Sequence, residues 1–456
     1  MLNYVRIPKS GVTLNITTLA DYQIKSNVML DFRVLITLKA ILKLTNVKIK
    51  LIITALSACI SLQVLATPIF GQNLQELSTF SNTYTTTGAD SSVYGSVMSG
   101  DVGTTGAGGA ISGDFTAVGA LTIGGISSRG VIATVGGSMT SGGALTTGDS
   151  STVGGGITAG GAATVGAASG VRGNMAAAGA VSTGAASKVF GNIEAGGAAS
   201  IGVGGSVDGT VYAVGVYTED INSTPQTSAV ITSNPVDAGT LVAGLINTVA
   251  NNQLQILKAQ LAFRNMVTYK VLDATMPANL TLFSGVYEAP SFSTTATTTL
   301  TLDGQNKKDQ YWVFNIGDII KMGANSKIVM VNGANSDSVI WNAGGYADFG
   351  AGSSFLGTLL AREYIHVGAN ALALGPGNSC GGLFSAKSYV STGDAAKIGG
   401  DGCIGIASGF HIDDQGVAYF QTAEIPEPAT LIFFVISIAL IVLSLRRKKV
   451  NRTAIF

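Results

Sequence analysis

Charged residues, aromatic residues, cysteine and histidine are all scarce in this sequence. Of its 456 residues, 11% are charged and 7% are aromatic, and it holds 3 cysteines and 2 histidines. Catalytic and metal-binding sites draw mainly on histidine, cysteine and clustered carboxylates. His366 and His411 stand in no Ser/His/Asp arrangement and in no metal-ligand spacing, so we predict that both are structural. The sequence therefore predicts a protein that is not an enzyme, with no catalytic residue, metal ligand or cofactor.

The few charges are placed unevenly along the chain. Lys+Arg and Asp+Glu both number 26, which gives a formal net charge of zero. Residues 1–66 and 446–456 hold much of the basic charge, so acidic residues outnumber basic ones between them. Because nucleic-acid binders need a basic patch, we predict no nucleic-acid partner. Polysaccharide-cleaving β-helices cluster charges on one face, which makes a carbohydrate-active enzyme the weaker alternative.

Glycine is abundant instead, with 61 residues, and the hydrophobic 46% of the chain is periodic. From Ala110 to Tyr217 the chain repeats every six residues, and the stronger period is eighteen. The residues with the clearest shared register are Val135, Val153, Val171, Val189 and Val207. A unit this short cannot bury its own apolar side chains, so the repeat predicts stacked turns of three strands, a three-sided β-solenoid. One extra hexad, Ser128 to Ala133, predicts a bulged corner.

Threonine opens many of the hexads, and an eighteen-residue turn would stack these residues into ladders. The predicted ladders, at three corners of the coil, are Thr116/Thr134/Thr152, Thr122/Thr140/Thr158 and Thr146/Thr164. A straight row of hydroxyls and methyls at strand spacing could order water into a lattice. The alternative is that threonine simply suits a pleated surface.

The pattern changes after the repeat. Residues 218–238 are polar and contain Pro225 and Pro235, so we predict a linker there. Residues 239–267 carry apolar side chains at three- and four-residue spacings, which predicts one long α-helix with Asp237 as its N-cap. The stripe predicted to be buried consists of Val242, Leu245, Ile246, Val249, Leu254, Leu257 and Leu261.

Short apolar segments separated by glycine-rich turns follow the helix. They predict strands at Thr299–Leu302, Tyr311–Ile316, Lys327–Val331, Val339–Trp341 and Phe355–Ala361. The turns have a recurring Gly-Ala-Asn-Ser pattern, in which glycine and asparagine tolerate the positive φ of tight corners. We therefore predict a second, less regular β-solenoid.

This second solenoid resembles a known family. The resemblance is carried by Leu282–Tyr287, Leu300–Asp303, Tyr311–Gly317, Val331–Ala334, Val339–Trp341 and Phe355–Ala361. These segments are similar to the ice-binding-like family found in cold-adapted microbes. The resemblance spans 237–412, with 77–108 supplying N-terminal turns, and implies an irregular right-handed β-solenoid with one long helix along its side. The hexads themselves are similar to the repeats of bactofilins, which form polymers.

The family resemblance also implies a kind of binding surface. Its members would contact ice through short threonine, alanine and asparagine side chains on one solenoid face. Outside the hexads, the candidate ligand-facing residues are Thr294, Thr295, Thr297, Thr298 and Thr299. No regular Thr-x-Thr array lies between Asp303 and Ile412. The sequence thus offers two candidate surfaces, the hexad ladders and this threonine cluster.

The N-terminal segment, residues 1–66, is predicted to be a targeting sequence. Lys48 and Lys50 precede the apolar run Leu51–Ala66, and small residues at Val64-Leu-Ala66 fit a signal-peptidase site. Leu56-Ser-Ala-Cys59 offers a lipoprotein cleavage site as the alternative.

The C-terminal segment carries a second targeting pattern. Pro426, Glu427 and Pro428 lead into an apolar run at 430–445, and Arg446-Arg-Lys-Lys449 follows. The run is short for a bilayer, which needs about twenty residues, and the basic flank predicts a cytoplasmic end. The pattern at 426–449 resembles the PEP-CTERM sorting signal of Gram-negative bacteria, which implies processing by an exosortase. An ordinary membrane anchor is the alternative.

Cys380 and Cys403 lie in the part of the chain predicted to be exported, separated by a glycine-rich stretch. An oxidising compartment favours a disulfide between them. The alternative is two free buried thiols.

The sequence therefore predicts a mainly β fold with two β-solenoids and one long α-helix packed alongside. The predicted boundaries are 1–66 for targeting, 67–91 for the start of the ice-binding-like body, 92–217 for the hexads, 218–238 for the linker, 239–267 for the helix, 268–412 for the second solenoid, 413–425 for a tail and 426–449 for the sorting signal. We expect a cell-surface, outer-membrane-associated or extracellular protein of a Gram-negative bacterium that binds an extended regular surface, ice or exopolysaccharide. The alternative function is a purely structural surface or biofilm-matrix element.

Overall fold

A computed structural model describes residues 67–220, 222–230, 233–308, 310–334, 339–374, 381–400 and 409–421. The chain divides into two compact units, Met1–Leu65 and Ala66–Phe456, and all of the described residues belong to the second. The targeting segment 1–66, Cys380, Cys403 and the sorting signal 426–449 lie outside these ranges. Within them, no helix has both the length and the apolar character needed to cross a bilayer.

The hexads form parallel strands, three to a turn. In one turn, β13 (Thr152–Val153), β14 (Ile157–Ala159) and β15 (Ala163–Val165) follow one another. Thr152 pairs with Gly170, and Ile157 pairs with Met175. Side chains eighteen residues apart therefore stack directly, as the sequence predicts. The valine row from Val135 to Val207 points inward and is at most 1% exposed, which is the burial that a single turn could not provide.

Two long parallel sheets make up the three sides of the coil. One side is a 13-stranded sheet. Its strands in order are β23 (Tyr217–Glu219), β21 (Ala199–Ile201), β18 (Val181–Thr183), β15, β12 (Leu145–Thr147), β9 (Leu121–Ile123), β6 (Gly103–Thr105), β3 (Thr85–Thr87), β40 (Val390–Thr392), β37 (Ile365–Val367), β34 (Ala347–Phe349), β31 (Ile320–Met322) and β28 (Phe292–Ser293).

The other two sides belong to a 27-stranded sheet. The second side holds β26 (Asn279–Leu282), β29 (Thr299–Asp303), β32 (Lys327–Val331), β35 (Ser354–Leu356), β38 (Leu372–Leu374), β41 (Lys397–Ile398), β4 (Ser92–Val93), β7 (Ala110–Ile111), β10 (Thr134–Val135), β13, β16 (Gly170–Val171) and β19 (Lys188–Val189). The third side holds β25 (Lys270–Val271), β27 (Gly285–Ala289), β30 (Trp312–Ile316), β33 (Val339–Ala343), β36 (Thr358–Ala361), β39 (Leu383–Ser385), β2 (Leu77–Ser81), β5 (Ser96–Ser99), β8 (Phe115–Ala117), β11 (Met139–Ser141), β14, β17 (Met175–Ala177) and β20 (Ile193–Ala195). The longer strands β22 (Ser206–Ala213) and β24 (Thr224–Val230) pair along both sides.

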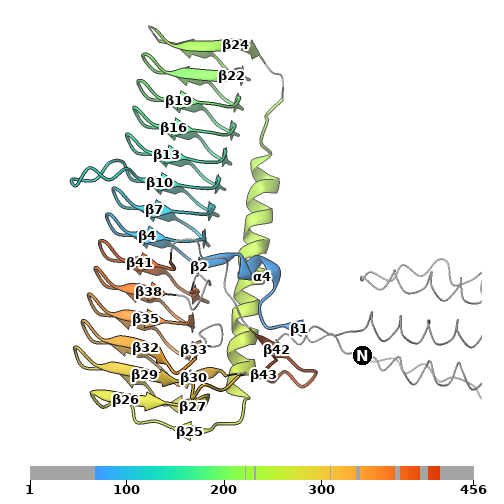
Figure 1. The fold of residues 1–456 in the computed structure, drawn as a ribbon. Helices are drawn as coiled ribbons and strands as arrows, with labels where there is room; N and C mark the ends of the chain where they lie inside the picture. The colour runs from blue at the N-terminus through green and yellow to red at the C-terminus, as the bar shows by residue number, and fades with distance from the viewer. Residues whose placement is uncertain are drawn as a thin grey trace, which may run out of the picture. The chain divides into compact units, whose positions relative to one another are not determined.

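The two predicted solenoids stack end to end as one continuous coil (Figure 1). On the third side, β2 lies between β39 and β5, and on the 13-stranded side β3 lies between β40 and β6. The mainly β fold with one long helix is confirmed. The first turns of the described chain thus lie between the hexads on one side and the last turns of the C-terminal part on the other.

The extra hexad makes one turn longer than the others. Thr134 pairs with Ala110, which is 24 residues earlier instead of 18. The added residues project between β9 and β10, where Ile126, Val131 and Ile132 are exposed. Arg129 in this projection forms a 2.9 Å ion pair with Asp90.

The long helix α4 (Ala238–Arg264) begins at Asp237, whose side chain accepts a hydrogen bond from the Thr240 amide at 3.2 Å. Of the predicted buried stripe, Val249 is buried, but Ile246, Leu254 and Leu261 are 51%, 53% and 61% exposed. Besides Val249, the helix buries Asn252, Ile256, Ala259, Gln260, Ala262 and Phe263. This face packs on apolar residues of the third side, among them Phe80, Ile340 and Phe384.

Amide side chains explain why this face of the helix is buried. The Gln260 amide nitrogen donates to the carbonyls of Ala343 and Leu360 at 2.9 and 3.1 Å. In return, Asn342 donates to the Gln260 carbonyl at 2.9 Å, and Asn315 donates to the Phe263 carbonyl at 2.7 Å. Buried polar groups need such partners, so these bonds orient the helix on the sheet.

Two segments predicted to lack regular structure contain strands. The predicted linker 218–238 includes β24, which pairs with β22 and adds further hydrogen bonds to the coil. The predicted tail 413–425 includes β43 (Ala418–Phe420), which pairs with β42 (Phe410–Ile412). With β1 (Thr67–Pro68) these two strands form a separate three-stranded sheet. The short helix α3 (Gln72–Gln75) lies between β1 and β2.

Candidate functional site

The 13-stranded side carries one unbroken row of hydroxyl side chains. The middle residues of eight consecutive strands, from β3 to β23, pair directly with one another: Thr86, Thr104, Thr122, Thr146, Thr164, Ser182, Ser200 and Thr218. Successive side chains of a strand point to opposite faces. Leu145 and Thr147 on β12 are buried while Thr146 between them is exposed, so the row faces outward. We call the outer surface of strands β6 to β23 the hydroxyl face.

Small residues flank this row on both sides. Two positions before each hydroxyl lie Val102, Ala120, Ala144, Ala162, Ala180, Ala198 and Val216, whose carbonyls accept the ladder hydrogen bonds from neighbouring strands. Two positions after it lie Gly106, Gly124, Gly148, Gly166, Gly184 and Gly202. None of these residues is charged, but the position two after Thr218 is Asp220. From β6 to β21 the hydroxyl face is therefore flanked by uncharged residues and nearly free of large side chains.

The glycine row is required by the close approach of neighbouring turns. A Cβ atom on Gly124 would lie 2.5 Å from the carbonyl carbon of Gly106, and one on Gly166 would lie 2.5 Å from that of Gly148. Contacts below 3.0 Å with backbone atoms cannot be relieved by a side-chain rotation. The sequence keeps glycine here because the corner brings backbone against backbone.

The hydroxyls of this row have little to bind within the protein. Among the described residues, the one side-chain hydrogen bond within the row joins Ser182 to Thr164 at 3.3 Å. Neighbouring strands lie about 4.8 Å apart, so the row presents hydroxyls and methyls to water at a regular interval. Such an array can hold water molecules in fixed positions, because donors, acceptors and apolar groups all repeat with the strands.

The structure regroups the threonine ladders that the sequence predicts. Thr134 and Thr152 pair on the second side, Thr140 and Thr158 on the third side, and Thr146 and Thr164 on the hydroxyl face. The placement of Thr116 and Thr122 is corrected: Thr116 pairs with Thr140, and Thr122 with Thr146. The extra hexad lengthens that one turn, so the eighteen-residue interval fails there. All of these threonines lie within strands, and the prediction of corners is wrong.

The ladders on the other two sides lose their regularity within a few turns. After Thr152 the second side continues through Gly170 and Lys188, where Lys188 forms an ion pair with Asp208 at 3.3 Å. After Thr158 the third side continues through Ala176, Glu194 and Tyr212. A flat, rigid partner would therefore meet charged or bulky side chains on the second side and on the third side of the coil.

The second candidate cluster forms a turn between β28 and β29 instead of a surface. Thr297 has a positive φ of 61°. The hydroxyls of Thr295 and Thr298 hydrogen-bond each other at 3.1 Å, and Thr298 donates to the Thr295 carbonyl at 2.9 Å. Thr294 accepts from the Gly323 amide at 2.9 Å, and Thr299 lies on β29 between Asn279 and Lys327. These residues stabilise the turn with their hydroxyls and make no flat row.

Beyond β3 the 13-stranded side changes character. Tyr84, Tyr389, Tyr364 and Tyr346 stack in that order, with ring centroids 4.5, 5.1 and 4.6 Å apart. Partial burial, followed by the effect of neighbouring phenols, raises the pKa of Tyr364 and of Tyr389 above the usual value for tyrosine. The stacked rings are large, so they end the small-residue surface.

Beside the tyrosines, the hydroxyl row continues into Ser391, His366 and Asp348. The structure thus brings together a serine, a histidine and an aspartate that the sequence does not place in one motif. The His366 Nδ1 atom and the Ser391 hydroxyl are 3.0 Å apart. Within the described residues, neither a hydrogen bond nor an ion pair joins Asp348 to His366. A catalytic triad needs both bonds, so this row gives no support for nucleophilic catalysis.

Sequence reasoning missed five members of the hydroxyl row. Thr86 and Thr104 precede the array of hexads, while Ser182, Ser200 and Thr218 follow Thr164. The signal that identifies them is the eighteen-residue interval with one interval of twenty-four inserted between Thr122 and Thr146. Serine in place of threonine hid the second half of the row.

Comparison with known proteins agrees with the resemblance found in the sequence. Residues 177–396 match the Ice-binding-like family. The match includes the last hexad turns as well as the helix and the C-terminal turns. The bactofilin and PEP-CTERM resemblances receive no such support.

Two characterised relatives carry ice-binding names. Ice-binding protein 1 of Shewanella frigidimarina (strain NCIMB 400) is 34% identical over 114 residues, which cover 25% of this chain and 12% of that protein. The ice-binding protein of Nostoc sp. (strain HG1) is 31% identical over 185 residues, which cover 38% of this chain and 65% of that protein. The chain thus spans less than two thirds of the length of either relative.

Solved structures of ice-binding proteins are also similar. One from an Antarctic biological consortium is 14% identical with a TM-score of 0.34, and covers 74% of this chain and 93% of that chain. The ice-binding protein 1 domain of Shewanella frigidimarina is 23% identical with a TM-score of 0.29, and covers 42% of this chain and 86% of that chain.

Proposed function

We propose that this chain is a non-enzymatic, exported protein that binds ice through the hydroxyl face. The observation that carries the proposal is the row from Thr104 to Thr218, which is flanked by alanine or valine on one side and mostly by glycine on the other. The names of the Shewanella and Nostoc relatives and the family match at 177–396 support it. Neither the threonines of the other two sides nor the Thr294–Thr299 turn makes a comparable row.

Ice binding requires a flat surface with regularly spaced groups. A crystal plane is rigid, so a protein that holds it must present its groups at fixed intervals without protruding side chains. Stacked parallel strands fix the interval in one direction, and alternate residues along each strand fix it in the other. Hydroxyls can donate and accept hydrogen bonds to ordered water, while the threonine and alanine methyls favour contacts that exclude mobile water.

A bulky side chain in the middle of the row tests the proposal. Thr146→Tyr would raise one point of the hydroxyl face above its neighbours, and we expect it to lose most thermal hysteresis and ice-recrystallisation inhibition. Thr152→Tyr is the matched control, because Thr152 also lies mid-coil on an outward position but on the second side. Circular dichroism would check that both variants fold. If wild-type protein leaves ice growth unchanged at micromolar concentration, a structural surface or matrix role replaces the proposal.

The two ends of the chain complete the proposed function. In this proposal residues 1–66 direct export, and 426–449 form a sorting signal that holds the protein in the membrane through 430–445 until an exosortase cleaves it. Ice binding at the cell surface or in an exopolysaccharide matrix would then keep cells near ice. Mass spectrometry of the mature protein tests this part: we expect both terminal segments to be missing. Recovery of Pro426 to Phe456 on the mature surface protein would contradict processing.

A further inference from the structure

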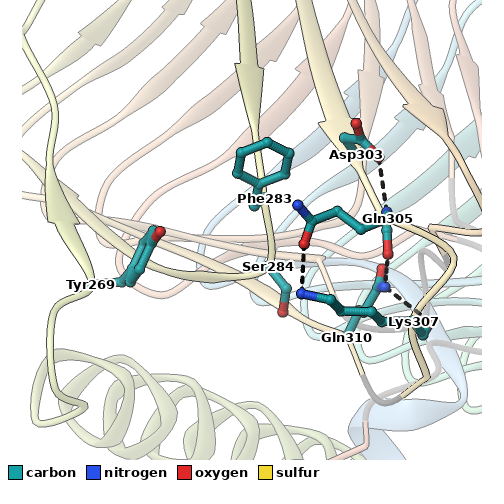
Figure 2. A pocket seen from close by; sticks show the side chains of 8 residues that line it. Tyr269, Phe283, Ser284, Asp303, Gln305, Lys307 and Gln310 are labelled. Carbon is teal, nitrogen blue, oxygen red and sulfur yellow. Dashed lines mark hydrogen bonds between the residues drawn. The ribbon is translucent and has the colours of Figure 1, made fainter.

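A pocket lies at the end of the coil that is farthest from the hexads in the strand order. It has a volume of about 470 Å³ and is lined by Tyr269, Phe283, Ser284, Asp303, Gly304, Gln305, Lys307 and Gln310. The strands next to it, β25 and β26, are edge strands, because within the described part of the chain each pairs on one side only. Figure 2 shows the two aromatic rings on one side of the pocket, and Asp303, Gln305, Lys307 and Gln310 on the other.

The loop is held rigidly in an unfavourable backbone conformation. Gln305 and Asn306 both have positive φ, 52° and 53°, a region that non-glycine residues rarely occupy. Asp303 Oδ1 fixes them by accepting hydrogen bonds from the Gln305 amide at 2.8 Å and from the Asn332 side chain at 2.9 Å. The Gln310 side chain donates to the carbonyls of Gly304 and Lys307. Strain held in this way is common at binding sites, because it pre-organises the groups that meet a ligand.

The pocket is lined by one negative and one positive side chain, and some of its polar atoms are available to a ligand. The hydrogen bonds to Asp303 lower its pKa, so it is a carboxylate at neutral pH, and Lys307 supplies one opposite charge. The Lys307 ammonium donates to the Gln305 side-chain oxygen at 2.8 Å, which leaves the Gln305 amide nitrogen facing outward as a donor. Both Asp303 bonds use Oδ1, so Oδ2 has no partner among the described residues. The pocket therefore offers donors and an acceptor without a net charge.

The aromatic wall is exposed to solvent. Tyr269 is 63% exposed and Phe283 is 42% exposed, although large apolar side chains usually lie inside. Tyr269 contacts Tyr287 edge-on, with centroids 5.9 Å apart, so this ring is fixed in place. An aromatic surface beside paired donors and acceptors suits a ligand with an apolar ring face and hydroxyls around its rim.

We propose that this end pocket binds a neutral saccharide. One sugar ring lies against Phe283 and Tyr269. Its hydroxyls donate to Asp303 Oδ2 and accept from the amide of Gln305 and the ammonium of Lys307. The neutral balance of the lining disfavours an anionic sugar, because no surplus positive charge is present. The site lies at the end of the coil and away from the hydroxyl face, so one chain could hold ice and a sugar chain at the same time.

The proposal is tested with the full chain and a panel of free sugars: maltose, cellobiose, N-acetylglucosamine and galacturonic acid. We expect saturation-transfer NMR signals and millimolar affinity for at least one neutral sugar, and none for galacturonic acid. Phe283→Ala should weaken that affinity about tenfold or more. Gln305→Asn should weaken it similarly, because asparagine tolerates the positive φ at 305 but its amide is one methylene shorter. Thr146→Tyr should leave sugar binding unchanged while it removes most of the ice activity.

Two results would overturn the proposal. One is that no neutral sugar binds at a concentration of about 0.1 M, which is high enough to detect even very weak sites. The other is that sedimentation detects self-association of the wild type that Phe283→Ala removes, because the exposed rings would then cover a second copy of the chain. Unchanged thermal unfolding of Phe283→Ala and Gln305→Asn confirms that any lost binding reflects the pocket and not misfolding.

Discussion

At the scale of single residues, the size of the side chain decides what each position of the coil can hold. Inward positions of the hexads hold mainly alanine, valine, leucine, isoleucine and methionine, because the turns enclose a narrow apolar space. Corner positions such as Gly166 leave no room for a side chain, because the preceding turn lies against their backbone. Outward positions are open, and there the choice of threonine, serine and alanine reflects the surface and not the fold.

This difference gives a direct test of the corner. Gly166→Ala places a Cβ atom 2.5 Å from the Gly148 backbone, whereas Gly170→Ala meets nothing within 4 Å. We expect Gly166→Ala to lower the free energy of unfolding by about 1–3 kcal/mol, the usual cost of overpacking. Gly170→Ala should be neutral or stabilising by up to about 1 kcal/mol, because alanine restricts the unfolded chain. Urea unfolding followed by circular dichroism measures both. Equal effects of the two variants would contradict a corner set by backbone contact.

At the scale of elements, the repeat predicts the strands well because each hexad is local. The eighteen-residue interval places Val153 over Val171 and Thr146 over Thr164, and the structure agrees. The sequence also shows the extra hexad, but the predicted ladders keep the eighteen-residue interval across it and so misplace Thr116 and Thr122. A shift of six residues moves a strand to the next side of the coil, so a single insertion regroups every ladder that crosses it.

The helix shows where sequence periodicity fails. Apolar spacing alone selected Leu254 and Leu261, which face solvent, and passed over Asn252 and Gln260, which are buried. The helix lies on a sheet whose Asn315 and Asn342 side chains and Ala343 and Leu360 carbonyls need hydrogen-bond partners. These partners come from residues far along the chain. The sequence of the helix alone therefore cannot predict which of its faces is buried.

At the scale of the whole described coil, the order of turns in space differs from the order in sequence. Thr79 pairs with Leu383, and Thr86 pairs with Ser391, about 300 residues later. The hexads therefore extend a coil that the C-terminal turns begin, and helix α4 returns the chain from the hexads toward the opposite end (Figure 1). The repeat predicts both sets of turns but not the residues that pair at the junction, because that pairing involves no repeat. The family resemblance places 77–108 with the C-terminal turns, and the structure agrees. The hydroxyl face gains most of its length from the inserted hexads.

If the hexads are interchangeable turns of one coil, a deletion should be tolerated only when it removes a whole turn. Deletion of Gly170–Ser187 removes β16, β17 and β18 and brings Lys188 onto Thr152, which keeps every later strand on its own side. We expect this variant to fold, to lose a few degrees in its unfolding temperature, and to lose part of its ice activity because Ser182 leaves the row.

Deletion of Gly170–Val181 is the matched control. It removes only two hexads and moves each later strand to the next side of the coil. Glu194 and Tyr212 of the third side would then enter the hydroxyl face, and β24 would end one side away from the start of α4. That variant should unfold at a much lower temperature and lose all ice activity in the recrystallisation assay. Equal behaviour of the two deletions would mean that the turns do not stack as one coil.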